Sequence, residues 1–221
     1  ASTGIFRTFR SYPMDAVIWD TQNGRRLTTL EEGPADHNIL MPVNVATFSP
    51  DGTRLATASH VASVFLWDTA TGKKLQAFDA KAGMAYAVAF SPDGRTLATG
   101  HVNNVAVLWD VATGARLAAL EGHSAQVLAL AFSPDGRLLA TAAPDNSAIV
   151  WDVATRRRLR SLNGHSAALT SVLFSADSAR VYTGSHDGTV RAWSVSDGRE
   201  LARLSTLDGG HEWLTITAEG Y

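Results

Sequence analysis

Short apolar segments alternate with turn-forming residues along nearly the whole chain. VLALAF, at 127–132, is a continuous apolar run, as expected of a strand buried on both faces. SPDG follows at 133–136 and places Pro, Asp and Gly where a tight turn needs them, and LLATAA and AIVWDV are further runs of strand length. The pattern predicts an all-β chain of short antiparallel strands.

This pattern repeats every 42 residues. FSPDG begins at Phe48, Phe90 and Phe132, and the altered copy FSADS begins at Phe174. A Trp follows each Phe after 19 residues, at Trp67, Trp109, Trp151 and Trp193. Four antiparallel strands in about 42 residues make the blade of a β-propeller. We therefore predict repeats near 42–79, 84–121, 126–163 and 168–205.

Hairpin turn pairs separate the third and fourth predicted strands. They are NG at 23–24, TG at 71–72 and 113–114, and DG at 197–198. The remaining copy has Arg156 where the others place Gly. If the backbone there is left-handed, Arg156 carries strain of roughly 1 kcal/mol.

The repeated motifs resemble the WD-repeat family, in a bacterial-type form, across essentially the whole chain. The resemblance rests on FSPDG, LATAS, LWD and the GH pairs at 122–123 and 164–165. Two departures stand out: Ser194 replaces the Asp of the WD pair, and the first two full repeats have no GH. The resemblance implies a β-propeller fold.

The two ends of the chain fall on the same 42-residue grid. ITAEG at 216–220 is in register with FSPDG, and IFRTFRS, AVIWDT and RRLTTL read as the second to fourth strands of a blade that lacks its first. We therefore expect a single domain over 1–221, a closed five-bladed β-propeller in which 1–31 and 211–221 share one blade. EWLTI would pair beside IFRTFRS. The alternative is a fragment of a longer protein, open or closed by oligomerisation.

A His, a Thr and an Asp within residues 123–145 are the residue types of a hydrolytic triad. The same set recurs 42 residues later, however, and a catalytic group is normally needed once whereas a structural device is needed once per blade. The WD-repeat resemblance implies a buried hydrogen-bonded network instead, and a buried Thr leaves no room for a substrate carbonyl. We expect no catalytic residues. The implied network residues are His123, Thr141, Asp145, Trp151, His165, Thr183, Asp187 and Trp193.

The earlier repeats depart from this set. Lys81 and Ile39 occupy the His positions, and Asn103 and Val61 occupy the Asp positions, so we expect the network to be lost there.

Composition narrows the choice of partners. The net charge is −2, 45% of residues are hydrophobic, and there is no Cys. These values disfavour nucleic acid and membrane partners and exclude thiol chemistry. No apolar run approaches the ~20 residues that span a bilayer, so we expect a soluble cytoplasmic protein without cofactors. His60, His101 and His186 lie on different repeats, which favours exposed loop residues over a metal site. The basic residues at 156–160 favour protection of an edge strand over a nucleic-acid patch.

The leading functional hypothesis is a non-catalytic scaffold for protein–protein interaction. The expected contact site is the ring of loop residues at the mouth of the central channel, where aromatic and His side chains beside apolar ones suit a protein or peptide. The alternatives are an enzyme or small-ligand binder at the same mouth, and a targeting module of a larger bacterial protein. The expected partner-binding residues are Tyr12, His60, Val102, Pro144 and His186.

Overall fold

The computed structural model describes residues 3–5, 16–30, 43–59, 63–79, 81–207 and 212–217. All regular elements in these ranges are β-strands, which confirms the all-β prediction. The strands form five separate antiparallel sheets, numbered here sheet 1 to sheet 5 in chain order.

The strands follow the repeat. Sheet 1 contains β1 (Thr3–Ile5), β2 (Ala16–Asp20) and β3 (Arg26–Leu30). Sheet 2 contains β4 (Val43–Phe48), β5 (Arg54–Ser59), β6 (Ser63–Asp68) and β7 (Lys74–Asp79). Sheet 3 contains β8 (Ala85–Phe90), β9 (Thr96–His101), β10 (Val105–Asp110) and β11 (Arg116–Glu121). Sheet 4 contains β12 (Ala129–Phe132), β13 (Leu138–Ala142), β14 (Ser147–Asp152) and β15 (Arg158–Asn163). Sheet 5 contains β16 (Leu169–Phe174), β17 (Arg180–Ser185), β18 (Thr189–Ser194), β19 (Glu200–Leu207) and β20 (Glu212–Thr217).

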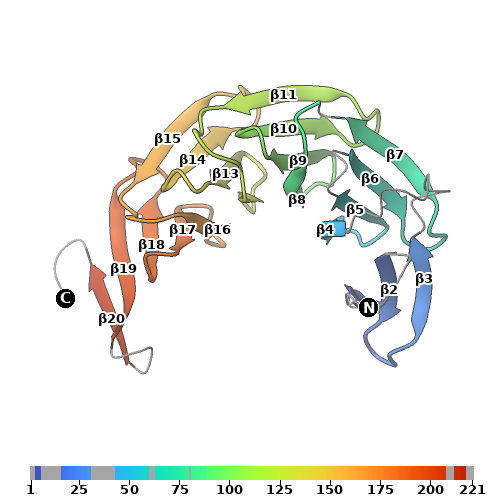
Figure 1. Cartoon of the computed structure of the whole chain (residues 1–221), viewed down its shortest axis with the longest axis horizontal. Coiled ribbons are helices and arrows are strands. Elements are labelled where there is room, and N and C mark those ends of the chain that lie inside the picture. Colours follow the sequence, from blue (N-terminus) through green and yellow to red (C-terminus); the bar gives the residue numbers. More distant parts are fainter. Residues whose placement is uncertain are drawn as a thin grey trace.

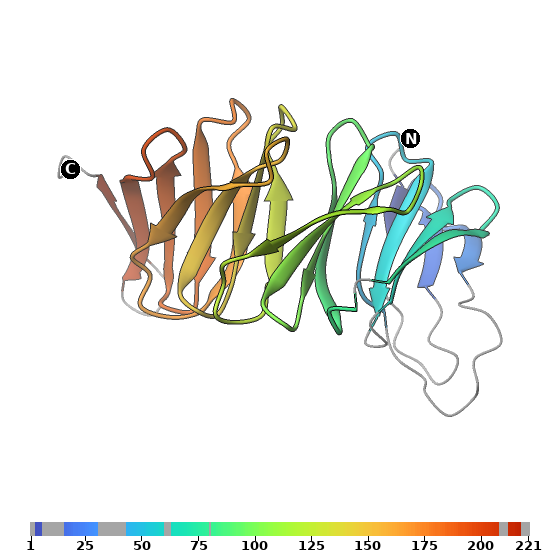
Figure 2. The ribbon, with the colours of Figure 1, turned by 90° about the horizontal axis from the view of Figure 1, so that it is seen from above.

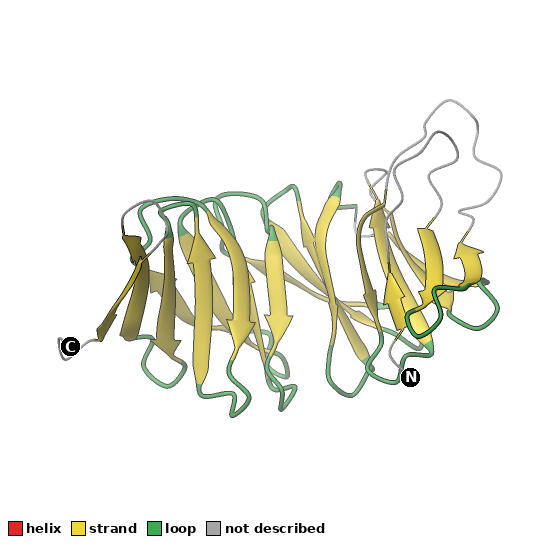
Figure 3. Ribbon diagram, turned by 90° about the horizontal axis from the view of Figure 1, so that it is seen from below, coloured by secondary structure: helices red, strands yellow, loops and turns green. Residues whose placement is uncertain are grey.

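The five sheets follow one another along an open arc (Figure 1). In sheets 2 to 5 the first strand lies on the inner side of the arc and the fourth on the outer side, and the two ends of the chain lie at opposite ends of the arc. The loops gather at the two ends of the strands (Figures 2 and 3). One of these ends carries the GH loops and the turns between second and third strands, and we call it the loop face.

Polar side chains close the turns at the opposite end. In the SPDG turn of sheet 4, the Ser133 hydroxyl donates to Asp135 at 2.5 Å and accepts from the Leu138 backbone N–H at 2.9 Å. In the hairpin between the third and fourth strands, Asp152 accepts from the backbone N–H and hydroxyl of Thr155. These bonds recur from sheet to sheet because the turn residues repeat, and they set the register of each hairpin.

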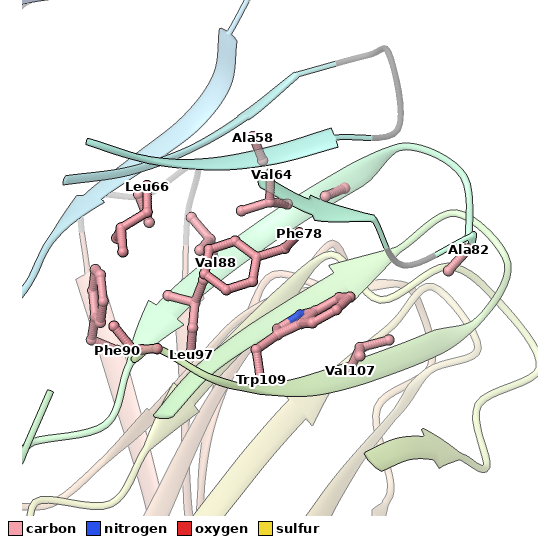
Figure 4. Close-up of a cluster of buried hydrophobic side chains, with 13 residues drawn as sticks. Ala58, Val64, Leu66, Phe78, Ala82, Val88, Phe90, Leu97, Val107 and Trp109 are labelled. Atoms are coloured by element: carbon pink, nitrogen blue, oxygen red, sulfur yellow. The ribbon is translucent and has the colours of Figure 1, made fainter. Parts of the chain in front are cut away.

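The hydrophobic core lies between successive sheets. Between sheets 2 and 3, Leu66 and Phe78 pack against Leu97 and Trp109 (Figure 4). The Phe78 and Trp109 ring centroids are 5.5 Å apart. Equivalent clusters join sheet 1 to sheet 2, sheet 3 to sheet 4, and sheet 4 to sheet 5. Each sheet thus has a leading face, which packs on the preceding sheet, and a trailing face, which packs on the following one.

The expected ring closure is wrong. Strand β20, which contains EWLTI, pairs with β19 as a fifth strand of sheet 5, with Ala202 opposite Thr217 and Leu207 opposite Glu212. It does not pair with sheet 1, where β1 pairs only with β2 among the described strands. The free outer edge of β19 is adjacent along the chain. Pairing with it costs far less loop-closure entropy than reaching the other end of the arc.

The predicted second strand of the N-terminal blade also differs. We expected IFRTFRS at 5–11, but β1 ends at Ile5, and residues 6–15 lie outside the described part of the chain. Gly4 pairs opposite Trp19, whereas in sheet 4 Leu139, only 12 residues before Trp151, takes that position. The register is therefore shifted in sheet 1.

Candidate functional site: the buried histidine networks and the loop face

His123 connects the loop before sheet 4 to the strands of that sheet. Its Nδ1 lies 2.9 Å from Asp145 Oδ2, and its Nε2 lies 2.8 Å from the Thr141 hydroxyl. The Trp151 indole N–H donates to the same hydroxyl at 3.0 Å. Asp145 also accepts from the backbone N–H of Ser124. The structure brings all four of the residues singled out in this repeat into one chain of hydrogen bonds.

Sheet 5 contains the same arrangement. His165 Nδ1 lies 2.8 Å from Asp187 Oδ2, and its Nε2 lies 2.8 Å from the Thr183 hydroxyl. The Trp193 indole N–H donates to Thr183 at 2.8 Å. Arg191 is an addition: it is buried, donates to Glu200 at 2.8 Å, and lies 3.8 Å from Asp187. The equivalent residue in sheet 4 is Ile149, so this ion pair is particular to sheet 5.

The chemistry of these bonds determines the proton positions. A carboxylate can only accept, so Nδ1 of His123 carries the hydrogen and its Nε2 accepts from Thr141. Burial by itself raises the pKa of Asp145, but hydrogen bonds from Ser147, the Ser124 backbone and His123 outweigh it and hold that pKa below its ordinary value. The same balance, led by burial and then by bonds from Thr189 and His165, lowers the pKa of Asp187. Both carboxyls are therefore ionised at neutral pH.

The Thr hydroxyls of both networks are inaccessible. Thr141 and Thr183 are buried, and each hydroxyl already accepts from a Trp and contacts a His. A nucleophile needs space beside it for the reacting carbonyl, and neither Thr has it. The arrangement can tie a loop to a sheet, and it offers no path for acyl transfer.

The GH glycines allow the loop to approach the sheet closely. A Cβ at Gly122 would lie 3.2 Å from the Trp151 ring and 3.3 Å from Ile149. At Gly164 it would lie 2.7 Å from Arg191 and 3.1 Å from the Trp193 ring. Gly therefore precedes the His because the loop backbone rests on the Trp of the same sheet.

His101 corrects two of our expectations. We expected an exposed loop residue and a lost network in this repeat, but His101 ends β9 and is 0% exposed. Its Nε2 lies 2.8 Å from the Thr99 hydroxyl, which accepts from the Trp109 indole at 2.9 Å. Its Nδ1 lies 3.1 Å from the Gly83 carbonyl. A strand His thus replaces the loop His, and a backbone carbonyl replaces Asp.

Sequence reasoning missed His101 although a signal was present. Side chains two apart on a strand point to the same side, so a His two residues after the buried Thr99 faces the same network. We had instead counted it with the loop residues. Burial lowers the pKa of His101, with a smaller contribution from the positive charge of Arg116. The ring is therefore neutral at neutral pH.

Sheets 1 and 2 retain less of the network. In sheet 2 the Trp67 indole donates to Thr57 at 2.8 Å, and no His contacts that hydroxyl among the described residues. In sheet 1 the buried Nε1 of Trp19 has no hydrogen-bond partner. The number of members thus falls toward the N-terminal end of the arc.

The expected partner-binding residues are only partly visible. Val102 and Pro144 are half-buried, and His186 is exposed, with its backbone N–H donating to the Ala168 carbonyl. Tyr12 and His60 lie outside the described residues. The three visible residues occupy equivalent loops of sheets 3, 4 and 5, on the loop face.

The one pocket that stands out among the described residues lies at the opposite end of the strands. It is an open hollow of about 400 Å³ between the turns of sheets 3 and 4, lined by Asp93, Asp135, Arg137 and Asp152 among others. The three carboxylates already accept hydrogen bonds within their own turns. Within the described ranges no group of three or more His, Asp or Glu side chains is placed to hold a metal ion. No helix in those ranges has the length and apolarity to cross a membrane.

The family follows from this geometry together with the repeats. The family model described as WD domain, G-beta repeat matches residues 27–68, 72–110, 114–152 and 156–194, which together make up more than half of the chain. The chain therefore belongs to the WD40-repeat family, whose repeats generally mediate protein–protein interactions as scaffolds. This confirms the resemblance seen in the sequence.

A solved structure agrees with the assignment. The crystal structure of the RRP9 WD40 repeats is similar to this chain, with a TM-score of 0.69 and 25% sequence identity. The match covers 76% of this chain and 52% of the RRP9 chain, so the present chain spans about half of that protein's length.

Proposed function

We propose that this chain is a non-catalytic scaffold that binds protein or peptide partners on its loop face. The observation that carries the proposal is that the His–Thr–Trp arrangement occurs in three successive sheets. A reactive centre is needed once, whereas a device that holds a loop in place is needed wherever a loop must be rigid. Sheets 3, 4 and 5 each tie the loop that enters the sheet to its strands.

Rigid loops favour recognition because little conformational entropy is lost when a partner binds. His186 is exposed on this platform, and Val102 and Pro144 add apolar surface beside it. Such a combination of an imidazole and apolar side chains suits a protein or peptide partner better than a phosphate group. A cytoplasmic location and a bacterial origin stay predictions from the sequence.

The runner-up is an enzyme or small-ligand binder at the channel mouth. It requires converging polar groups in a pocket on the loop face. The pocket described above lies at the other end of the strands, between the turns of sheets 3 and 4, and lends this alternative no support. A targeting module of a larger protein is the third possibility, and it is compatible with a scaffold role.

Partner capture tests the proposal. The chain would be immobilised and incubated with native lysate, as wild type and as the loop-face variant His186→Ala/Val102→Asp. The matched control is Asp93→Ala/Arg137→Ala at the opposite end. Loss of the same captured proteins with the loop-face variant alone is the expected result. Capture that is unchanged by the loop-face variant, or lost with the control variant alone, would overturn the assignment to this face.

A further inference from the structure

The contacts between neighbouring sheets use the same sequence positions each time. On the trailing face of sheet 4, Ala140 and Ala148 are fully buried and Ala131 packs against the same cluster. They are covered by the leading face of sheet 5, chiefly Leu169, Val172 and Trp193. The trailing faces of sheets 1, 2 and 3 are covered in the same way.

The trailing face of sheet 5 has no such cover. The residues 42 positions after the three alanines are Leu173, Tyr182 and Val190, all larger than the residues they replace. Leu173 is 63% exposed and Val190 is 43% exposed. Strand β20 extends this sheet at its outer edge and leaves these side chains exposed. Neighbouring exposed apolar side chains on one sheet face mark an interaction surface.

A complementary face lies at the other end of the arc. Ile18 and Leu30 of sheet 1 pack toward sheet 2, so the alternate residues of β2, Val17 and Trp19, lie on its leading face. Val17 takes the position of Ile149 in sheet 4, which is buried against the preceding sheet, yet Val17 is only half-buried. The arc thus carries one uncovered trailing face and one uncovered leading face among its described residues.

The shapes of the two faces also correspond. Leu173 lies on β16, the innermost strand, and in the interior of the arc the innermost strands of adjacent sheets contact each other. Sheet 1 has three described strands where sheets 2, 3 and 4 have four. A smaller sheet leaves space opposite the inner strand, which is where sheet 5 carries the bulkiest change, from Ala131 to Leu173.

From these observations we propose that the trailing face of sheet 5 binds the leading face of sheet 1 of a second copy of this chain. The association is head to tail, because the two faces differ, and it continues the packing already seen four times within the arc. A heterologous contact of this kind produces a ring when the rotation closes and a filament when it does not. This inference stands independently of the partner-binding proposal above, which concerns the loop face.

The absence of Cys allows a direct test on the full chain. Val190→Cys on sheet 5 and Val17→Cys on sheet 1 would be prepared separately, mixed, and treated with a short bismaleimide crosslinker. The mixture is expected to give a covalent dimer in at least tenfold greater yield than either variant alone. Leu75→Cys, on the exposed outer strand of sheet 2, replaces Val17→Cys in the control mixture and is expected to give only the background yield.

Three results would overturn the inference. They are a mixture that crosslinks no better than the control, a Val190→Cys variant that crosslinks equally well by itself, and a wild type that sediments as a monomer at every concentration. A second variant, Leu173→Asp, addresses the association without crosslinking. It is expected to abolish the concentration-dependent increase in sedimentation coefficient while leaving the far-ultraviolet circular dichroism of the wild type, since Leu173 is exposed.

Discussion

The Nδ1 atom of His101 lies 3.1 Å from the carbonyl oxygen of Gly83, and this contact ties β9 to the loop that enters sheet 3. In sheet 4 the corresponding connection runs the other way, from a loop His to a carboxylate in the turn after the second strand. The two solutions differ in sequence but satisfy the same requirement. A buried Thr hydroxyl that accepts from a Trp also needs a partner for its own hydrogen, and an imidazole with its second nitrogen satisfied supplies one.

Replacing His101 should therefore destabilise the protein. His101→Leu keeps the apolar volume but leaves the Gly83 carbonyl and the Thr99 hydroxyl without their partner. We expect a loss of about 2 kcal/mol in the free energy of unfolding, measured by chemical denaturation. His186→Leu, on an exposed residue, is the control and should change that free energy by no more than about 0.5 kcal/mol. Equal losses in the two variants would contradict a network role for His101.

The same residue should make stability depend on pH. Burial lowers the pKa of His101 in the folded protein, whereas an unfolded His titrates near pH 6.5. Below about pH 6.5 the unfolded chain therefore binds a proton that the folded chain does not. Stability from this group is complete above that pH and falls by up to about 1.4 kcal/mol per pH unit as the pH drops toward the folded pKa.

Denaturation curves between pH 5 and 8 would measure this effect. The difference in unfolding free energy between wild type and His101→Leu should shrink as the pH falls, because the variant lacks the titrating group. The His186→Leu curve should run parallel to the wild type. A difference that stays constant across this range would show that His101 does not titrate abnormally.

Two equivalent Thr residues separate the contribution of the His. Thr183 accepts from Trp193 and contacts His165, whereas Thr57 accepts from Trp67 alone among the described residues. Thr183→Val should cost about 3 kcal/mol because it leaves two buried groups without a partner, and Thr57→Val should cost about 1 kcal/mol. Both can be read from urea denaturation midpoints at a common slope. Similar costs at the two sites would mean that the His adds nothing to the Thr–Trp pair.

Arg156 is a site where the protein can be stabilised. Its φ angle is 62°, in the region that the four equivalent hairpins fill with Gly, so the expected left-handed conformation is confirmed. Arg156→Gly should raise the free energy of unfolding by about 1 kcal/mol, less a few tenths for the greater freedom of Gly in the unfolded chain. Arg157→Gly, one residue further and outside this region, should give no gain. A thermal shift in the same direction for both variants would argue against relief of strain.

Much of the fold could be predicted because its determinants are local. The spacing from Phe132 to Trp151, the SPDG turn and the hairpin at Arg156 each report on a few adjacent residues, and these predicted the strands of sheets 2 to 5. The loop His residues were also recognisable, since GH precedes a sheet with a fixed spacing to Thr and Asp. His101 escaped notice because its partner is a backbone carbonyl, which has no signature in a sequence.

The sequence by itself determined the blade, since strand period and turn chemistry act over short distances and recur with each repeat. Only the tertiary structure decided what becomes of the ends. EWLTI reads as an inner strand in either case, and its backbone groups can pair equally well with any free edge. The outer edge of β19 is close along the chain whereas sheet 1 is distant, so the lower cost of a short loop placed β20 beside β19 and left the arc open.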